Sequence, residues 1–199
     1  MNLDLEEGKF LVETARNAIE SYLNKRKLAL KDENLADVFK EKRGVFVTLN
    51  TYPANRLRGC IGYPLAYEPL IDGVISSAVS AAFSDPRFRQ LSKEELRNIT
   101  VEVTVLSPMK LLDKKIDYKR QIKIGEDGLF IVCGQNSGLL LPQVPVEWKW
   151  TEDEFLREIC IKAGLSDDCY ENKNCDLYSF TGQIFKETEP LGEVVEEKN

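Results

Sequence analysis

The same order of predicted elements occurs twice along the chain, and this order limits the folds available to it. The run "GVFVTL" at 44–49 predicts a strand by its β-branched and aromatic residues, and so does "GLFIVC" at 128–133. Each run is followed by another predicted strand, a helix and a further strand. We therefore expect an α+β fold with two β-β-α-β repeats, at about 44–107 and about 122–187. The alternative is that the two α+β halves agree by chance. If the repeats are real and pack together, the cleft between them is a natural place for a ligand.

Hydrophobic periodicity predicts the elements around these repeats. Apolar residues at helical spacing predict an N-terminal helix over 4–27, with a capping box at Asp4 and Glu7 and a basic last turn at 25–27. Residues 108–120 are charged and predict a linker, and residues 188–199 predict a mobile acidic tail. The other expected elements are helices at 34–40, 69–83 and 151–163, a capped turn at Ser92 and Glu95, and strands at 56–62, 99–106, 122–124, 138–141 and 177–185.

The composition is that of an ordinary soluble protein of 199 residues, long enough for one large domain or two small ones. The chain starts without a basic segment followed by an apolar one, so we expect no secretory signal and a cytoplasmic location. Its net charge of -6 disfavours general nucleic-acid binding, although a local basic patch is compatible with it. The five cysteines are expected to be free thiols in a reducing cytosol.

The chain contains no histidine, which removes much of the usual catalytic repertoire. Ser-His-Asp and Cys-His pairs are excluded within this chain, so acid–base chemistry has to use Cys, Asp, Glu, Lys, Tyr or water. Cysteine spacings typical of zinc sites and the glycine loops that bind nucleotide phosphates are missing as well. We therefore expect neither a metal nor a cofactor.

The stretch "LRGCIG" at 57–62 combines a thiol with a cation in a predicted strand. Alternation puts Arg58 and Cys60 on one face, while Leu57 and Ile61 on the other face serve the core. A guanidinium near Cys60 would lower its pKa and favour the reactive thiolate, or it could clamp an anionic ligand. The alternative is that Cys60 is a small buried apolar residue and Arg58 a member of a structural ion pair.

Other candidate site residues belong to this strand or to later segments of the first repeat. Gly59 and Gly62 would permit close approach of a ligand or of another backbone segment. In "SDPRFR", Asp85 can accept hydrogen bonds within the turn, and Arg87 could join the arginine of the strand in an anion site. Glu102 lies in the middle of the strand "ITVEVTVL", where it would act as a general base, pair with an arginine or face solvent.

The stretch "LLLPQVPVEWKW" at 139–150 groups polar residues with tryptophans. Its two prolines limit regular pairing and predict a fixed extended segment. An amide, a carboxylate and an indole from Gln143, Glu147 and Trp148 could hold a planar ligand, with Glu147 as a second candidate base. The alternative is that the tryptophans only fill the seam between the repeats.

These stretches together resemble the AMMECR family. "LRGCIG", "DPRF", "VEVTVLSP", "DGL", "GLLLPQVPVEW" and "KAGL" follow one another here in the order that this family shows. The resemblance runs from Phe10 to Glu187 and implies one domain over 1–187, with a larger and a smaller part and a cleft between them. It also implies a functional role for "LRGCIG", without a settled reaction. Some members carry a histidine where this chain has Asp127, which speaks against a mechanism that needs it.

Two functions are compatible with these observations. In the first, the protein is an enzyme that binds a small anionic or nucleotide-like substrate in the cleft, with its charge held by Arg58 and Arg87. Cys60 would then act as nucleophile or acid, and Glu102 or Glu147 as base. In the second, it is a non-catalytic binding or adaptor module. Prokaryotic members of the resembled family are called the A component of the AmmeMemoRadiSam system. The resemblance therefore implies a Memo-like protein and a radical S-adenosylmethionine protein as partners. RNA is a separate candidate partner for such a module.

Overall fold

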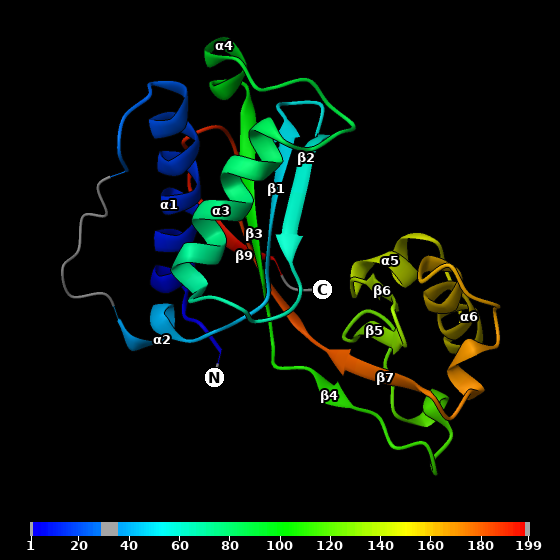
Figure 1. Cartoon of the computed structure of the whole chain (residues 1–199). Helices are drawn as coiled ribbons and strands as arrows, with labels where there is room; N and C mark the ends of the chain where they lie inside the picture. The colour runs from blue at the N-terminus through cyan, green and yellow to red at the C-terminus, as the bar shows by residue number, and fades with distance from the viewer. Residues whose placement is uncertain (1, 29–35, 198–199) are drawn as a thin grey trace. The chain divides into compact units, whose positions relative to one another are not determined.

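The computed structural model describes residues 2–28 and 36–197, which form two compact units of helices and antiparallel sheets (Figure 1). Unit 1 contains the described residues up to Leu106 and those from Gln183 onwards, and unit 2 contains residues 107–182. The expected α+β class is thereby confirmed. Within the described residues, no helix combines the length and the apolarity that crossing a membrane requires.

Unit 1 has a sheet with the strand order β2-β1-β3-β8-β9, in which β1 pairs antiparallel with both β2 and β3. Helices α1 and α3 pack on one face of this sheet (Figure 1). Its elements are α1 (Leu5–Leu23), α2 (Asp37–Lys40), β1 (Val45–Thr51), β2 (Arg56–Tyr63), α3 (Leu70–Phe83), α4 (Lys93–Leu96), β3 (Ile99–Leu106), β8 (Gly182–Glu187) and β9 (Val194–Glu197).

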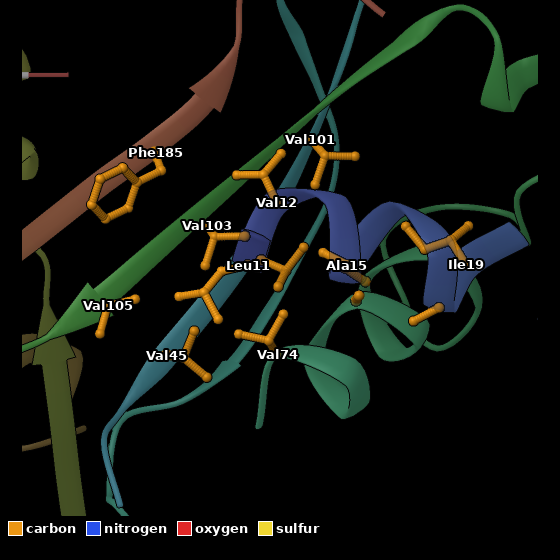
Figure 2. Packing of buried hydrophobic residues seen from close by; sticks show 14 of the residues in the cluster. Leu11, Val12, Ala15, Ile19, Val45, Val74, Val101, Val103, Val105 and Phe185 are labelled. Carbon is orange, nitrogen blue, oxygen red and sulfur yellow. The ribbon is translucent and has the colours of Figure 1, made fainter. Parts of the chain in front are cut away.

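The core of unit 1 lies between the two long helices and the sheet (Figure 2). Leu11 and Ala15 on α1 and Val74 on α3 pack against strand side chains such as Val45 and Val103, and all five are fully buried. Because side chains alternate along a strand, the intervening residues of β1 and β3 point to the opposite face, on which none of the described helices of this unit packs. This helix-free face is where the polar side chains of the sheet gather.

The helix ends follow the local sequence signals with one exception. Asp4 and Glu7 form the expected capping box of α1, but α1 ends at Leu23 and its last turn holds no basic residue. The basic run at 25–27 therefore follows the helix, because Lys25 adopts a positive φ of 52° that ends it. The expected helix at 34–40 is observed as α2, and its first expected residues lie outside the described residues.

In unit 2, two strands are followed by two helices and a further strand, and unit 1 contains a succession of the same kinds of element from β1 to β3. In its sheet, of order β4-β7-β5-β6, strand β5 lies between β6 and β7, as β1 lies between β2 and β3 in unit 1. Helix α6 begins after a capping box at Thr151 and Glu154, as expected. The elements of unit 2 are β4 (Lys110–Leu111), a 3₁₀ turn at Tyr118–Arg120, β5 (Gly128–Cys133), β6 (Asn136–Leu140), α5 (Gln143–Glu147), α6 (Glu152–Lys162), a 3₁₀ turn at Cys169–Glu171 and β7 (Cys175–Phe180).

Several sequence-based expectations are wrong in the later part of the chain. Residues 139–150 are not one extended segment, because they contain the end of β6 and helix α5. Pro142 and Pro145 lie before and in the first turn of α5, where a missing N–H breaks no helical hydrogen bond. Residues 122–124 form no strand, and the expected linker contains β4.

The expected final strand at 177–185 and the expected mobile tail are also corrected. Two strands, β7 and β8, replace the single strand and belong to different sheets, with Thr181 between them. Part of the acidic tail is strand β9, which pairs antiparallel with β8. A strand that changes sheets keeps its apolar alternation, so the sequence pattern alone does not reveal the break.

Four cysteines are paired, so the expectation of free thiols is wrong for them. Cys133 and Cys175 lie directly opposite each other on β5 and β7 and form one disulfide. Cys160 on α6 and Cys169 form the other. Both pairs are set by the packing of unit 2, since their spacing along the chain matches no standard motif. Cys60 is the free cysteine in the described part of the chain.

Replacing Gly59 by alanine is expected to lower the free energy of unfolding of unit 1 by about 1–3 kcal/mol. A Cβ atom at this position would lie 2.2 Å from the carbonyl oxygen of Ala81, so β2 would have to move away from α3. Urea unfolding followed by circular dichroism measures the loss. The control Tyr67→Ala, at a side chain that is 72% exposed, should leave the unfolding transition unchanged. Equal stability of the two variants would contradict the close packing at Gly59.

Candidate functional site

Strand β2 is the outer strand of the unit 1 sheet, and two side chains take the place of a neighbouring strand at Cys60. The backbone N–H of Cys60 donates to Oδ2 of Asp85 at 2.9 Å, and Nη2 of Arg87 donates to the carbonyl oxygen of Cys60 at 3.2 Å. Both polar backbone groups of Cys60 are therefore satisfied without a further strand. Asp85 and Arg87 hold the loop after α3 against the "LRGCIG" strand.

Asp85 is a buried, charged residue at the centre of this arrangement. Arg87 donates from Nη2 to Oδ2 at 2.7 Å and from Nε to Oδ1 at 3.0 Å, and its backbone N–H donates to Oδ1 at 3.1 Å. These bonds, the side-chain bond from Arg87 above all, hold the pKa of Asp85 well below its usual range. The expected role of Asp85 as a hydrogen-bond acceptor within the turn is confirmed.

The thiol of Cys60 lies on the helix-free face of the sheet, half-buried beside Thr48. The hydroxyl Oγ1 of Thr48 donates to Sγ at 3.3 Å. Burial raises the pKa of Cys60, while the bond from Thr48 and the charge of Arg87 act in the opposite direction. The cation that acts on the thiol is therefore Arg87 and not Arg58.

A β-bulge moves Arg58 out of the alternation that the sequence predicts. On β1, Leu49 pairs with Gly59 and Asn50 pairs with Leu57, so Arg58 has no partner there. Leu57 is 42% exposed and Arg58 only 7%, which overturns the expectation that Leu57 serves the core. The bulge depends on how β2 meets β1, and one strand's pattern cannot show it.

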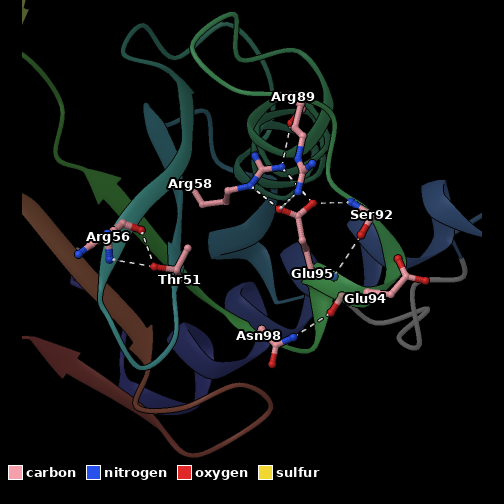
Figure 3. A network of polar contacts seen from close by, with 8 residues as sticks. All are labelled: Thr51, Arg56, Arg58, Arg89, Ser92, Glu94, Glu95 and Asn98. Atoms are coloured by element: carbon pink, nitrogen blue, oxygen red, sulfur yellow. Dashed lines mark hydrogen bonds and ion pairs between the residues drawn. The ribbon is translucent and has the colours of Figure 1, made fainter.

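Arg58 joins β2 to the segment that precedes β3 (Figure 3). Its Nε donates to Oε1 of Glu95 at 3.0 Å, and its Nη2 donates to the carbonyl oxygen of Arg89 at 2.9 Å. The guanidinium carbon also lies 5.8 Å from the ring centre of Phe88, and that of Arg87 lies 5.5 Å from the same ring. Arg58 and Arg87 thus both approach the ring of Phe88, but each is engaged in an ion pair with a carboxylate of this chain.

Glu102 lies in a row with Thr48 and Cys60 across three strands of unit 1. Thr48 on β1 is opposite Cys60 on β2 and opposite Glu102 on β3, so all three side chains share the helix-free face. Glu102 also lines a pocket of about 470 Å³. The other residues that line the pocket are Asn50, Thr51, Tyr52, Pro53, Asn55, Thr100, Lys186, Glu187, Thr188 and Glu197.

Glu102 is a shielded carboxyl group in this pocket with two charged residues nearby. Burial raises the pKa of Glu102 to about 7, with a further rise from the charge of Glu197 and a smaller lowering from Lys186. Lys186 forms an ion pair with Glu197, so both lie over the same face of β8 and β9. Glu102 is therefore able to take up or release a proton near neutral pH.

The remaining candidates belong to unit 2. Gln143 and Glu147 are the first and last residues of α5, and Trp148 follows directly. Trp148 is 69% exposed and stacks on Trp150, with ring centres 6.2 Å apart and planes at 19°. Asp127 accepts a bond from the backbone N–H of Lys123 at 2.8 Å, and burial raises its pKa. Among the described residues, no cluster of three or more Cys, Asp or Glu side chains could hold a metal ion.

Sequence reasoning missed most residues around the unit 1 site, Thr48, Lys186 and Glu197 among them. The sequence shows Thr48 as a polar residue in an otherwise apolar strand. Its contacts with Cys60 and Glu102 follow only from the register of β1 with β2 and β3. Lys186 and Glu197 carried no signal, because their strands were expected as one long strand and a tail. Glu95 was found as half of a capping box, a role it does have, but its pairing with Arg58 is tertiary.

The comparison with known families decides the relationship that the motifs suggested. The AMMECR1 family model matches residues 12–185. The chain belongs to the AMMECR1 family. It is 48% identical over 198 residues to protein MJ0810 of Methanocaldococcus jannaschii, with 98% of each chain covered, and 47% identical over 193 residues to protein PH0010 of Pyrococcus horikoshii, with 95% and 94% covered.

A solved AMMECR1-type structure supports the fold directly. The crystal structure of the uncharacterised protein PH0010 from Pyrococcus horikoshii covers 99% of this chain and 99% of its own, with a TM-score of 0.90 and 45% identity. A relative from Methanococcus aeolicus is 48% identical over 198 residues, again with 98% of each chain covered. The names of these AMMECR1 relatives state no reaction, so function has to be argued from the site.

Glu102 is expected to titrate near pH 7 in the AMMECR1 protein described here. The ¹³C chemical shift of its carboxyl carbon, followed against pH by NMR, measures this midpoint. Glu197→Gln should lower the midpoint by removing a negative neighbour, and Lys186→Met should raise it by removing a positive one. A midpoint near the ordinary value of about 4.3 in all three proteins would show that the carboxyl group is solvated.

Alkylation of Cys60 by iodoacetamide is expected to have a pH midpoint above that of a free cysteine, because burial disfavours the thiolate. Arg87→Gln should raise the midpoint further, since the charge of Arg87 lowers this pKa. Arg89→Gln, at an exposed side chain that pairs with Glu95, is the matched control and should leave the midpoint unchanged. A midpoint below that of a free cysteine would contradict this prediction and support the hypothesis that a nearby cation activates Cys60 as a thiolate.

Proposed function

We propose that this protein is an enzyme that transfers protons to or from a small polar substrate, with Glu102 as the general base in the pocket on the helix-free face of unit 1. The observation that carries the proposal is the placement of a shielded carboxyl group in a pocket large enough for a small molecule. A carboxyl group whose protonation changes near neutral pH is suited to such a step.

The charges around the pocket select the substrate class. Glu102, Glu187 and Glu197 bring carboxyl groups to its wall. Glu187 is paired with Arg16, and the cation Lys186 is already paired with Glu197. Arg58 and Arg87, which were expected to hold an anionic substrate, are paired with Glu95 and Asp85 and do not line this pocket. These contacts favour an uncharged or cationic substrate over an anionic or nucleotide-like one.

Hydrogen-bonding groups on the same walls would orient such a substrate. Asn50 and Asn55 offer amides, while Thr51, Thr100 and Tyr52 offer hydroxyl groups. A substrate with several hydroxyl, amide or amino groups would match them, because each such group can form a hydrogen bond with the pocket. An analogue with an apolar group at the same place would leave the pocket's polar group unpaired and bind more weakly. Cys60 does not line this pocket and is separated from Glu102 by Thr48, so the proposal gives it no part in the proton transfer.

Deuterium incorporation tests the proposal across several substrate classes at once. The protein is incubated in D₂O with pools of uncharged and cationic metabolites, and with nucleotides to represent the anionic alternative, and mass spectrometry detects exchange or product. Glu102→Gln should reduce the reaction at least about 100-fold, the usual contribution of a general base. The wild-type kcat/KM should rise with pH and level off above about 7, because the base works deprotonated.

Glu196→Gln is the matched control for this experiment. Glu196 neighbours Glu197 on β9 but points to the opposite face of the strand, so its loss should leave the rate within about twofold. Turnover of no pool member by the wild type, or equal rates for wild type and Glu102→Gln, would refute the proposal. The partners implied by the family resemblance, a Memo-like protein and a radical S-adenosylmethionine protein, stay predictions that this experiment leaves aside.

A further inference from the structure

The outer strands of the two sheets are protected unequally. On β2, Asp85 and Arg87 satisfy the outward backbone groups of Cys60. On β9 the last residues are acidic, and β4 has only two residues, one of them a lysine. Charged, very short or side-chain-covered outer strands are the usual means by which proteins prevent another strand from adding. Strand β6 has none of these features.

Strand β6 directs unpaired backbone groups away from its sheet. Its register with β5 starts from a two-residue turn after Cys133, which makes Asn136, Gly138 and Leu140 the hydrogen-bonded positions of the hairpin. The N–H and C=O groups of Ser137 and Leu139 therefore point outwards. Among the described residues, neither takes part in a hydrogen bond with a side chain or with backbone outside the hairpin.

An apolar groove begins at the end of the same strand. Helix α6 packs over β6 so closely that a Cβ atom on Gly138 would lie 2.8 Å from the backbone nitrogen of Ala163. The groove has a volume of about 680 Å³, and most of its side chains are apolar. Val146, beside it on α5, is 53% exposed as well. The residues that line the groove are Leu140, Val144, Trp148, Trp150, Glu158, Ile161 and Lys162.

We propose that β6 and this groove bind an extended, apolar segment of another protein, which adds to unit 2 as a further strand. The segment would pair its backbone with Ser137 and Leu139, and side chains of one face would enter the groove. This inference goes beyond the proposed function, because it concerns unit 2 and needs no residue of the Glu102 pocket.

The outward backbone groups decide between possible occupants. A bound helix satisfies its own backbone and would leave the groups of Ser137 and Leu139 without partners. An extended segment pairs with them and presents alternate side chains at the spacing that a groove beside a strand requires. Glu158 and Lys162, the charged residues that line the groove, carry opposite charges. We therefore expect apolar side chains, rather than charged ones, to anchor the partner segment.

Trp148 is the side chain expected to contribute most to this binding. It is 69% exposed and is oriented by stacking on Trp150, so little freedom is lost when a partner covers it. Tryptophan residues that become buried in an interface commonly dominate its binding energy. Ile161, 53% exposed on α6, lines the same groove.

The probe is a fluorescein-labelled octapeptide of alternating valine and threonine with a lysine at each end, and its fluorescence anisotropy is measured against the full chain. The peptide should bind, and a version N-methylated at every valine and threonine, which has no backbone N–H donor on either edge of that segment, should bind at least about 10-fold more weakly. Hydrogen exchange of the Ser137 and Leu139 amides should slow at least about 10-fold on saturation with the unmodified peptide.

Two variants separate the groove from the strand edge. Trp148→Ala and Leu139→Pro should each weaken binding at least about 10-fold, the first by removing the anchor and the second by removing an outward N–H that β5 does not use. Tyr67→Ala, an exposed aromatic residue of unit 1, is the control and should bind as the wild type does. Circular dichroism checks that all variants are folded. If Leu139→Pro does not fold, the comparison of Trp148→Ala with the wild type still tests the inference.

Three results would overturn the inference. The first is no binding of the unmodified peptide at millimolar concentration. The second is equal binding of the N-methylated peptide or equal binding by Trp148→Ala, which would place the peptide elsewhere. The third is a dimer in sedimentation that Trp148→Ala dissociates, which would make a second copy of the chain the occupant. None of these results affects the Glu102 proposal, whose reaction is measured separately.

Discussion

The antiparallel pairing of β1 with both β2 and β3 is the constraint on which the rest of unit 1 depends. Its register places Thr48 between Cys60 and Glu102 and turns the valines of β1 and β3 towards α1 and α3. A shift by one residue would move Glu102 into the apolar core and a valine to the helix-free face. The core and the candidate site therefore both follow from one register. A shifted register is disfavoured because it would bury the carboxylate of Glu102 in the apolar core.

A buried ion pair holds the ends of unit 1 on this sheet. Arg16 on α1 donates to both carboxylate oxygens of Glu187 on β8, and Glu187 also accepts the backbone N–H of Val101 on β3. Both charged side chains are more than nine-tenths buried, which is tolerated only where their hydrogen-bonding capacity is filled. Because β8 is tied to β3 in this way, Lys186 comes to lie near Glu102 and contributes to its pKa.

Local signals predicted the elements well wherever one element was in question. The caps at Asp4, Ser92 and Thr151 marked three helix starts, since a cap needs only residues within one turn. The alternation at 99–106 marked β3 with both its ends. The bulge at Arg58 and the disulfide partners of Cys133 and Cys160 were not predictable, because each depends on residues that another element supplies.

The sequence by itself determined the α+β class, the family, most helix and strand positions, and the limits on chemistry that follow from the absence of histidine. Of the candidate site, it indicated Cys60, Asp85 and Glu102 as residues worth testing. Only the tertiary structure decided that Arg58 pairs with Glu95, that burial raises the pKa of Cys60, and that Glu102 shares its pocket with Lys186. The physical reason is that charge state and contact depend on burial and on neighbours distant in the chain, which a local pattern does not contain.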